Sequence, residues 1–135
     1  ECGFIAKEQG ESLNKVQLTE FLNSTLCRRI LASPNVVREY QFTVNIGASD
    51  VVPDIDEKFA KENVVLQGAI DCVFEEDGAL VVVDYKTDKA DSAEFFKEHY
   101  GKQLELYANA IEKCTGKTAS QKILYSFYTG TEIFL

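Results

Sequence analysis

VVVDYKT, residues 81–87, runs an apolar segment directly into an acid, a base and a hydroxyl. Apolar residues at every position from 80 to 83 are typical of a strand that is covered on both faces, inside a sheet. Side chains alternate along a strand, so Asp84 and Lys86 are expected on one face, about 7 Å apart, and Tyr85 on the other. The stretch therefore predicts a central strand that ends in a charged pair.

The segment before this strand has the pattern of a tight hairpin. Asp77-Gly78 lies between two apolar runs, and Asp-Gly is typical of a two-residue turn. With these residues at the tip, the two strands pair so that Asp71 faces Asp84. A four-residue turn at the same place also keeps both acids on one face, whereas a three-residue turn separates them. The prediction of facing carboxylates depends on this turn.

Two facing carboxylates in a sheet repel each other and lose solvation, which is unfavourable unless a cation or a shared proton compensates. Asp71 stands out between Ala69 and Val73, its expected neighbours on that face, and Gly68 marks a close approach of a ligand or another backbone. Oxygen-only ligands favour Mg²⁺, Mn²⁺ or Ca²⁺ over zinc. For either acid taken alone, a solvated or lysine-paired position at a strand end is the alternative.

The composition is that of one domain with its own core: 135 residues, 45% hydrophobic and 27% charged. No run approaches the roughly 18 apolar residues of a membrane span, so no membrane partner is expected. The four cysteines show no C-x-x-C pair, which favours buried thiols in a reducing, cytoplasmic compartment over a zinc or redox motif. Because the chain lacks Met and begins at Glu1, we expect a single domain, 1–135, cut from a longer chain, with 1–10 as a frayed or cut connection.

The net charge of −8 is unusual for a nucleic-acid binder, which normally carries a basic surface. Either the ligand is not a polyanion, or a metal and neighbouring domains supply the positive charge.

Periodicity along the rest of the chain predicts alternating helices and strands. The expected elements are a helix over 12–32 with Ser12 as its N-cap, a strand over 36–46, a solvated loop over 47–62, a strand over 63–75, a helix over 92–113, and short strands over 123–128 and 132–135. The residues expected along one side of the long helix are Phe95, Phe96, His99, Gln103, Leu106, Tyr107 and Ala110.

Three motifs together resemble a known family. They are GAID at 68–71, VDYKT at 83–87 and YGKQLELY at 100–107. Their order and spacing resemble the RecB-family nucleases of the PD-(D/E)xK superfamily, and most of all the C-terminal nuclease domain of AddA-type helicase-nuclease subunits. REYQF at 38–42 resembles the strand that precedes the first acid in those domains. The resemblance implies an α/β, restriction-endonuclease-like core with a mixed central sheet flanked by helices.

The resemblance also implies an activity, namely Mg²⁺-dependent hydrolysis of DNA by the exonuclease module of a helicase-nuclease in double-strand-break repair and recombination. Mg²⁺, or Mn²⁺ or Ca²⁺ as substitutes, would be held by Asp71, Asp84 and the main-chain carbonyl of Tyr85. Lys86 would orient or activate the attacking water and complete the catalytic set. The implied partners are DNA, helicase domains of the same parent chain and a second helicase-nuclease subunit.

Further residues are implied at the rim of the site. Thr87, Gln103 and Tyr107 would contact the nucleic acid, the last two as the family's Q-x-x-x-Y pair one helical turn apart. For that pair, the alternative is a helix face that packs on the sheet with its polar tips at the rim. The secondary candidates are Gly68, Tyr100 and Glu39. Glu39 either approaches the site or pairs with Arg38 or Lys86.

One family motif is missing. Family members usually carry a metal-coordinating histidine on a helix well before the first acid, and no histidine precedes Asp71 here. His99, the one histidine in the chain, follows the acids and is expected as a half-exposed helix residue rather than a general base. Two other functions therefore stay open: a nuclease-like fold that serves as a structural or docking module, and an acid-based metal hydrolase acting on small phosphates.

Overall fold

The described residues form a mixed sheet with strand order β1-β2-β3-β4-β5. The computed structural model describes residues 14–135. The strands are β1 (Val36–Gly47), β2 (Asn63–Glu76), β3 (Ala79–Lys86), β4 (Ala119–Ser126) and β5 (Thr131–Phe134). Within this sheet β3 and β4 run parallel, and the other neighbouring pairs run antiparallel. The predicted mixed central sheet is confirmed.

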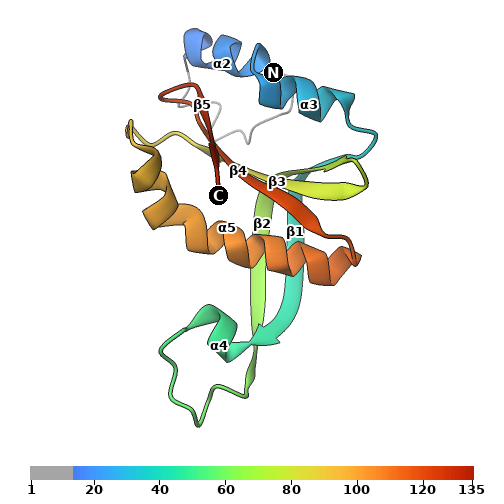
Figure 1. Cartoon of the computed structure of the whole chain (residues 1–135), viewed down its shortest axis with the longest axis vertical. Helices are drawn as coiled ribbons and strands as arrows, with labels where there is room; N and C mark the ends of the chain where they lie inside the picture. The colour runs from blue at the N-terminus through green and yellow to red at the C-terminus, as the bar shows by residue number, and fades with distance from the viewer. Residues whose placement is uncertain (1–13) are drawn as a thin grey trace.

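Helices cover both faces of this sheet. Helices α2 (Lys15–Leu22) and α3 (Thr25–Ala32) lie on one side and α5 (Ala93–Thr115) lies on the other, as Figure 1 shows. Each side has its own cluster of buried apolar side chains. Residues 80–83 of β3 are all buried and contribute to both clusters, which confirms the prediction of a strand covered on both faces. No helix of residues 14–135 is long and apolar enough to cross a membrane.

The hairpin between β2 and β3 has the predicted two-residue turn. Asp77 and Gly78 have φ values of 52° and 79°, the left-handed conformations that a type I′ turn requires. The paired residues on either side run from Glu76↔Ala79 to Cys72↔Val83, which is the predicted register.

The expected single helix over 12–32 is wrong, because the chain forms two helices there. Ser24 interrupts it: its hydroxyl accepts a hydrogen bond from the Cys27 amide at 3.1 Å and donates to the Phe21 carbonyl at 2.6 Å. The first helix is capped by Asn14 together with Gln17 in a capping box. The N-cap predicted at Ser12 lies outside the described residues.

The connection expected as a loop over 47–62 contains a short helix, α4 (Ala48–Val51), at the end of a two-stranded arm. β1 and β2 stay paired as far as Gly47↔Asn63, whereas the pairing of β2 with β3 ends at Cys72↔Val83. Figure 1 shows the arm leaving the body of the molecule beyond α5. The arm begins next to Asp71.

The side chains of β1 and β2 change faces at the base of the arm. Val36 packs into the cluster beneath α2 and α3, but Tyr40, four residues later, packs into the cluster beneath α5. Glu39 lies between them with φ 51°, a left-handed conformation that residues other than glycine seldom adopt. On β2, Ile70 takes the α5 side, so the expectation that Ala69 is the neighbour of Asp71 on that face is wrong.

Two further elements differ in detail from the prediction. The long helix is confirmed with Ser92 as its N-cap, but its buried residues are Phe96, Leu104, Ala108, Ala110 and Ile111, while His99 and Gln103 are exposed. β4 begins at Ala119 and ends at Ser126, earlier than the predicted 123–128.

Two of the described cysteines, Cys27 and Cys72, are buried as expected, and Cys114 is exposed.

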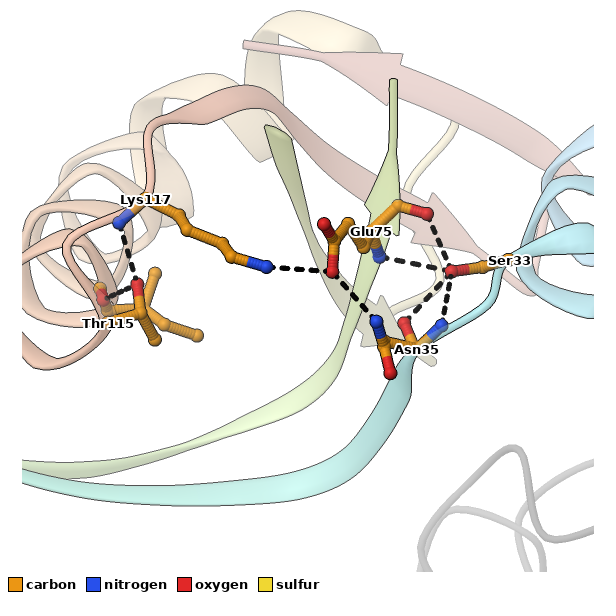
Figure 2. Close-up of polar contacts among 6 residues, drawn as sticks. Ser33, Asn35, Glu75, Thr115 and Lys117 are labelled. Carbon is orange, nitrogen blue, oxygen red and sulfur yellow. Dashed lines mark hydrogen bonds and ion pairs between the residues drawn. The ribbon is translucent and has the colours of Figure 1, made fainter. Parts of the chain in front are cut away.

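A polar network ties two connections to strand β2 at the end of the sheet away from the arm (Figure 2). The Ser33 hydroxyl donates to the Glu75 carbonyl at 2.6 Å and accepts from the Glu75 amide at 3.1 Å. The Glu75 carboxylate accepts from Asn35 and Lys117, each at 2.9 Å, and these hydrogen bonds, led by Lys117, lower its pKa. The network joins the start of β1 and the α5–β4 connection to β2.

Ser33→Ala is expected to lower the free energy of unfolding by about 1 kcal/mol, because it removes a hydroxyl that satisfies main-chain groups of β2. The expected fall in Tm is about 4 °C. Urea and thermal denaturation measure it, with Ser49→Ala, at an exposed position in α4, as the control. Equal stability of the two variants would contradict this role for Ser33.

Candidate active site

The carboxylate of Asp71 lies where β2 leaves β3. The next pair after Cys72↔Val83 would be Asp71 with Asp84, so the hairpin places these two acids opposite each other. Instead of a further ladder bond, the Asp71 Oδ2 accepts a hydrogen bond from the Tyr85 amide at 2.9 Å. A side chain thus replaces the main-chain acceptor that β3 loses when the arm departs.

Asp84 is the buried member of the pair, with 7% of its surface exposed. Burial, followed by the hydrogen bond to Asp71 and the negative charge of Asp71, raises the pKa of Asp84 to about 7. Lys86 opposes this shift through an ion pair with the Asp84 Oδ2 at 2.7 Å. Asp84 therefore lies between a facing acid, which disfavours its ionisation, and an adjacent cation, which favours it.

Lys86 is held between Asp84 and helix α5. Burial works against the charged form of Lys86, but the nearby charge of Asp84 and its hydrogen bond outweigh burial, so the pKa of Lys86 lies above its ordinary value. The ammonium nitrogen also lies 3.9 Å from the centre of the Tyr100 ring. These interactions favour the charged ammonium form of Lys86.

Helix α5 forms the wall of the site through Gln103 and Tyr107. The Gln103 side-chain amide donates to the Tyr107 hydroxyl at 3.2 Å. Burial raises the pKa of Tyr107, and the negative charge of Asp84 adds to the increase, so this phenol lies in the field of the acids. The Tyr107 ring also packs edge-to-face on Phe42, with ring centres 5.3 Å apart. The helix face both packs on the sheet and borders the site.

Gly68 allows this packing. A Cβ at this position would lie 2.7 Å from the Phe42 Cζ and 3.1 Å from the Tyr107 Cε1. The close approach at Gly68 is made by two aromatic side chains, whereas the prediction was a ligand or another backbone.

The remaining predicted residues, Thr87, Glu39 and His99, are all exposed. Thr87 is exposed directly after β3. Glu39 is exposed, and the pairs on either side of it place it alongside Asp71, while the described ion pair of Lys86 is made with Asp84. His99 is exposed and stacks on Phe95 with ring centres 4.0 Å apart. The expectation of a helix histidine outside the catalytic set agrees with this position.

The donor set fits a hard divalent cation. Within residues 14–135 no group of three or more His, Cys, Asp or Glu side chains is arranged to hold a metal. The oxygen donors that lie together are the Asp71 and Asp84 carboxylates, and the Asp71 carboxylate lies beside the main chain at Tyr85. A cation between these carboxylates would offset the repulsion that raises the pKa of Asp84.

Two contributors were missed in the sequence. Phe42 packs on Gly68 and Tyr107, and Asp88 accepts a hydrogen bond from the Tyr100 hydroxyl at 3.0 Å. Asp88 lies in a polar link together with Lys89 and Asp91, where nothing in the spacing sets it apart.

A comparison with known families places nearly the whole chain in one superfamily. The family model described as the PD-(D/E)XK nuclease superfamily matches residues 6–132. The chain belongs to this superfamily.

Curated relatives of this nuclease-superfamily chain are named as ATP-dependent helicase/nuclease subunits. The protein from Thermoanaerobacter sp. (strain X514) is 38% identical over 128 residues, which cover 93% of this chain and 10% of the relative. The protein from Clostridium botulinum (strain Alaska E43 / Type E3) is 37% identical over 136 residues, which cover 98% of this chain and 11% of the relative. The chain thus spans about a tenth of the length of these relatives.

Gly68→Ala is expected to destabilise the PD-(D/E)XK domain by about 1–3 kcal/mol, because the new methyl group overlaps the Phe42 ring. Adding Phe42→Leu should recover part of the loss by making space. Thermal denaturation measures both variants.

The matched control is Gly101→Ala on helix α5, where an added Cβ meets nothing within 4 Å. It should stabilise by up to about 1 kcal/mol through helix propensity. A Gly68→Ala variant as stable as the parent would refute the steric argument.

Asp71→Asn should stabilise the chain in EDTA at pH 8, by about 1 kcal/mol or more, since it keeps an oxygen acceptor for Tyr85 and removes one of two facing charges. Because the folded-state pKa of Asp84 is raised to about 7, the folded parent binds more protons than the unfolded chain between about pH 4 and pH 7. Stability of the parent should therefore fall as pH rises across that window, and the fall should be smaller in Asp71→Asn. Denaturation at several pH values tests this, with Asp54→Asn on the exposed connection as control; equal pH profiles for Asp71→Asn and the parent would contradict it.

Proposed function

We propose that the chain is the nuclease module of a helicase-nuclease and hydrolyses DNA phosphodiesters, as an exonuclease, in double-strand-break repair and recombination. The observation that carries the proposal is the meeting of Asp71, Asp84 and Lys86 at one place in a chain of the PD-(D/E)XK nuclease superfamily. The curated relatives, which are named as helicase/nuclease subunits, support the same proposal.

Asp71 and Asp84, with the Tyr85 main-chain carbonyl, would hold Mg²⁺, and Mn²⁺ or Ca²⁺ would substitute for it. When bound, the ion would supply Lewis-acid polarisation of the scissile phosphate and neutralise its developing charge. The repulsion between the buried Asp84 carboxylate and the facing Asp71 carboxylate supports this assignment.

Lys86 acts as a cation in this proposal. A raised pKa keeps its ammonium group protonated at neutral pH, so Lys86 donates hydrogen bonds and does not abstract a proton. Within reach of the acids, it orients the attacking water and stabilises negative charge on the phosphate. Thr87, Gln103 and Tyr107 contact the DNA at the rim.

The acidic composition is compatible with DNA binding only if other domains or subunits supply positive charge. The chain has a net charge of −8, which repels a polyanion. We therefore assign strand binding to helicase domains of a longer cytoplasmic parent chain, of which residues 1–135 form one domain, and to a second helicase-nuclease subunit.

A second candidate is a nuclease fold that serves as a docking module without turnover. Within residues 14–135 the acid pair has no third His, Cys, Asp or Glu ligand grouped with it, which is the observation that favours this candidate.

Metal titration and DNA cleavage together test the proposed function. Asp71→Ala and Asp84→Ala should abolish binding of Mn²⁺ in calorimetry, whereas Lys86→Ala should keep it. All three should lower cleavage of a DNA oligonucleotide in Mg²⁺ or Mn²⁺ by at least about 100-fold.

His99→Ala is the control that should keep the rate, since this side chain is exposed and stacks on Phe95. Cleavage that survives Asp84→Ala and Lys86→Ala would refute the catalytic assignment. Metal binding by the parent chain without any cleavage would favour the docking module.

A further inference from the structure

The Tyr100 ring faces the ammonium group of Lys86. The distance of 3.9 Å from the Lys86 nitrogen to the ring centre is that of a cation–π contact. The Lys86 side chain is 18% exposed, so this contact is partly shielded from water. Partial desolvation strengthens an attraction between a cation and an aromatic face.

Asp88 orients this ring. The Tyr100 hydroxyl donates to the Asp88 Oδ2 at 3.0 Å. Burial raises the pKa of Tyr100, and the hydrogen bond with Asp88 raises it further, so the phenol remains a protonated donor. Asp88 lies two residues after Lys86 in the link between β3 and α5, so the contact fixes the helix against the end of the strand.

Lys86 has two partners, the Asp84 carboxylate and the Tyr100 ring, and only Asp84 has a second proposed role. Asp84 is both the ion-pair partner of Lys86 and, in the proposed function, a ligand of the cation. A cation bound to Asp84 would weaken the attraction of Asp84 for Lys86 and would itself repel the ammonium group. The face of the Tyr100 ring carries no such competing role.

We infer that Tyr100, oriented by Asp88, is a positioning residue that holds Lys86 beside Asp71 and Asp84. Its consequence for catalysis rests on the proposed function. The contact itself is a property of the 135-residue chain without metal or DNA, and it can be measured separately.

The first experiment observes the contact by NMR. Protons on the carbon next to the Lys86 ammonium should be displaced upfield by the ring current of Tyr100 in the metal-free chain. The displacement should persist in Tyr100→Phe, which keeps the ring, and disappear in Tyr100→Leu. Tyr128→Leu removes an exposed tyrosine near β5 and should leave it unchanged.

The second experiment measures cleavage of a single-stranded DNA oligonucleotide in Mg²⁺ or Mn²⁺. Tyr100→Leu should lower kcat about tenfold with little change in KM, as expected for loss of a partly desolvated cation–π contact. Tyr100→Phe should stay within about threefold of the parent chain. Asp88→Ala should match Tyr100→Phe, and the double variant should show no added loss, because both remove the same hydrogen bond.

The inference is overturned if the Lys86 protons resonate at their ordinary positions, or if Tyr100→Phe is as impaired as Tyr100→Leu in kcat. A parent chain that shows the upfield displacement but no cleavage would count against the proposed function alone. In that case the response of the displacement to Tyr100→Leu and Tyr100→Phe decides the inference.

Discussion

The hydrogen bond between the Asp71 carboxylate and the Tyr85 amide is the contact on which the site depends. It forms at the point where the β2–β3 ladder stops and the β1–β2 arm begins. A sheet that divides at this point needs an acceptor for the last amide, and an acid that supplies one is brought against a second acid on the facing strand. The two carboxylates therefore lie together because the β2–β3 strand pairing ends at this point.

The fold holds Asp71 and Asp84 together although their charges repel each other. Burial and the facing carboxylates raise the pKa of Asp84 to about 7, so the metal-free site is less stable with both acids ionised. The ion pair with Lys86 partly offsets the negative charge at Asp84, and Lys86 in turn lies against the Tyr100 ring. In a protein of the nuclease superfamily, such stored repulsion is what a divalent cation would relieve.

Much of the site followed from local rules, and the remainder required tertiary contacts. The Asp77-Gly78 turn fixes the register that places Asp71 opposite Asp84, so the facing acids could be predicted from the turn and the alternation of strand side chains. The face change at Glu39 could not, because a glutamate gives no sign that its backbone is left-handed. The break at Ser24 was hidden because the apolar spacing continues across it, and the role of Asp88 depends on a contact made by a helix residue 12 positions away.

The two connections that flank the site differ in how freely their length can change. The link over residues 87–92 joins the strand that carries Lys86 to the helix that carries Tyr100, so an inserted residue there would shift one wall of the site against the other. The tip of the β1–β2 arm, over residues 48–62, lies at the far end of a two-stranded extension, as Figure 1 shows. Length variation among homologues should accordingly collect at the arm tip, and the link between β3 and α5 should keep a constant length.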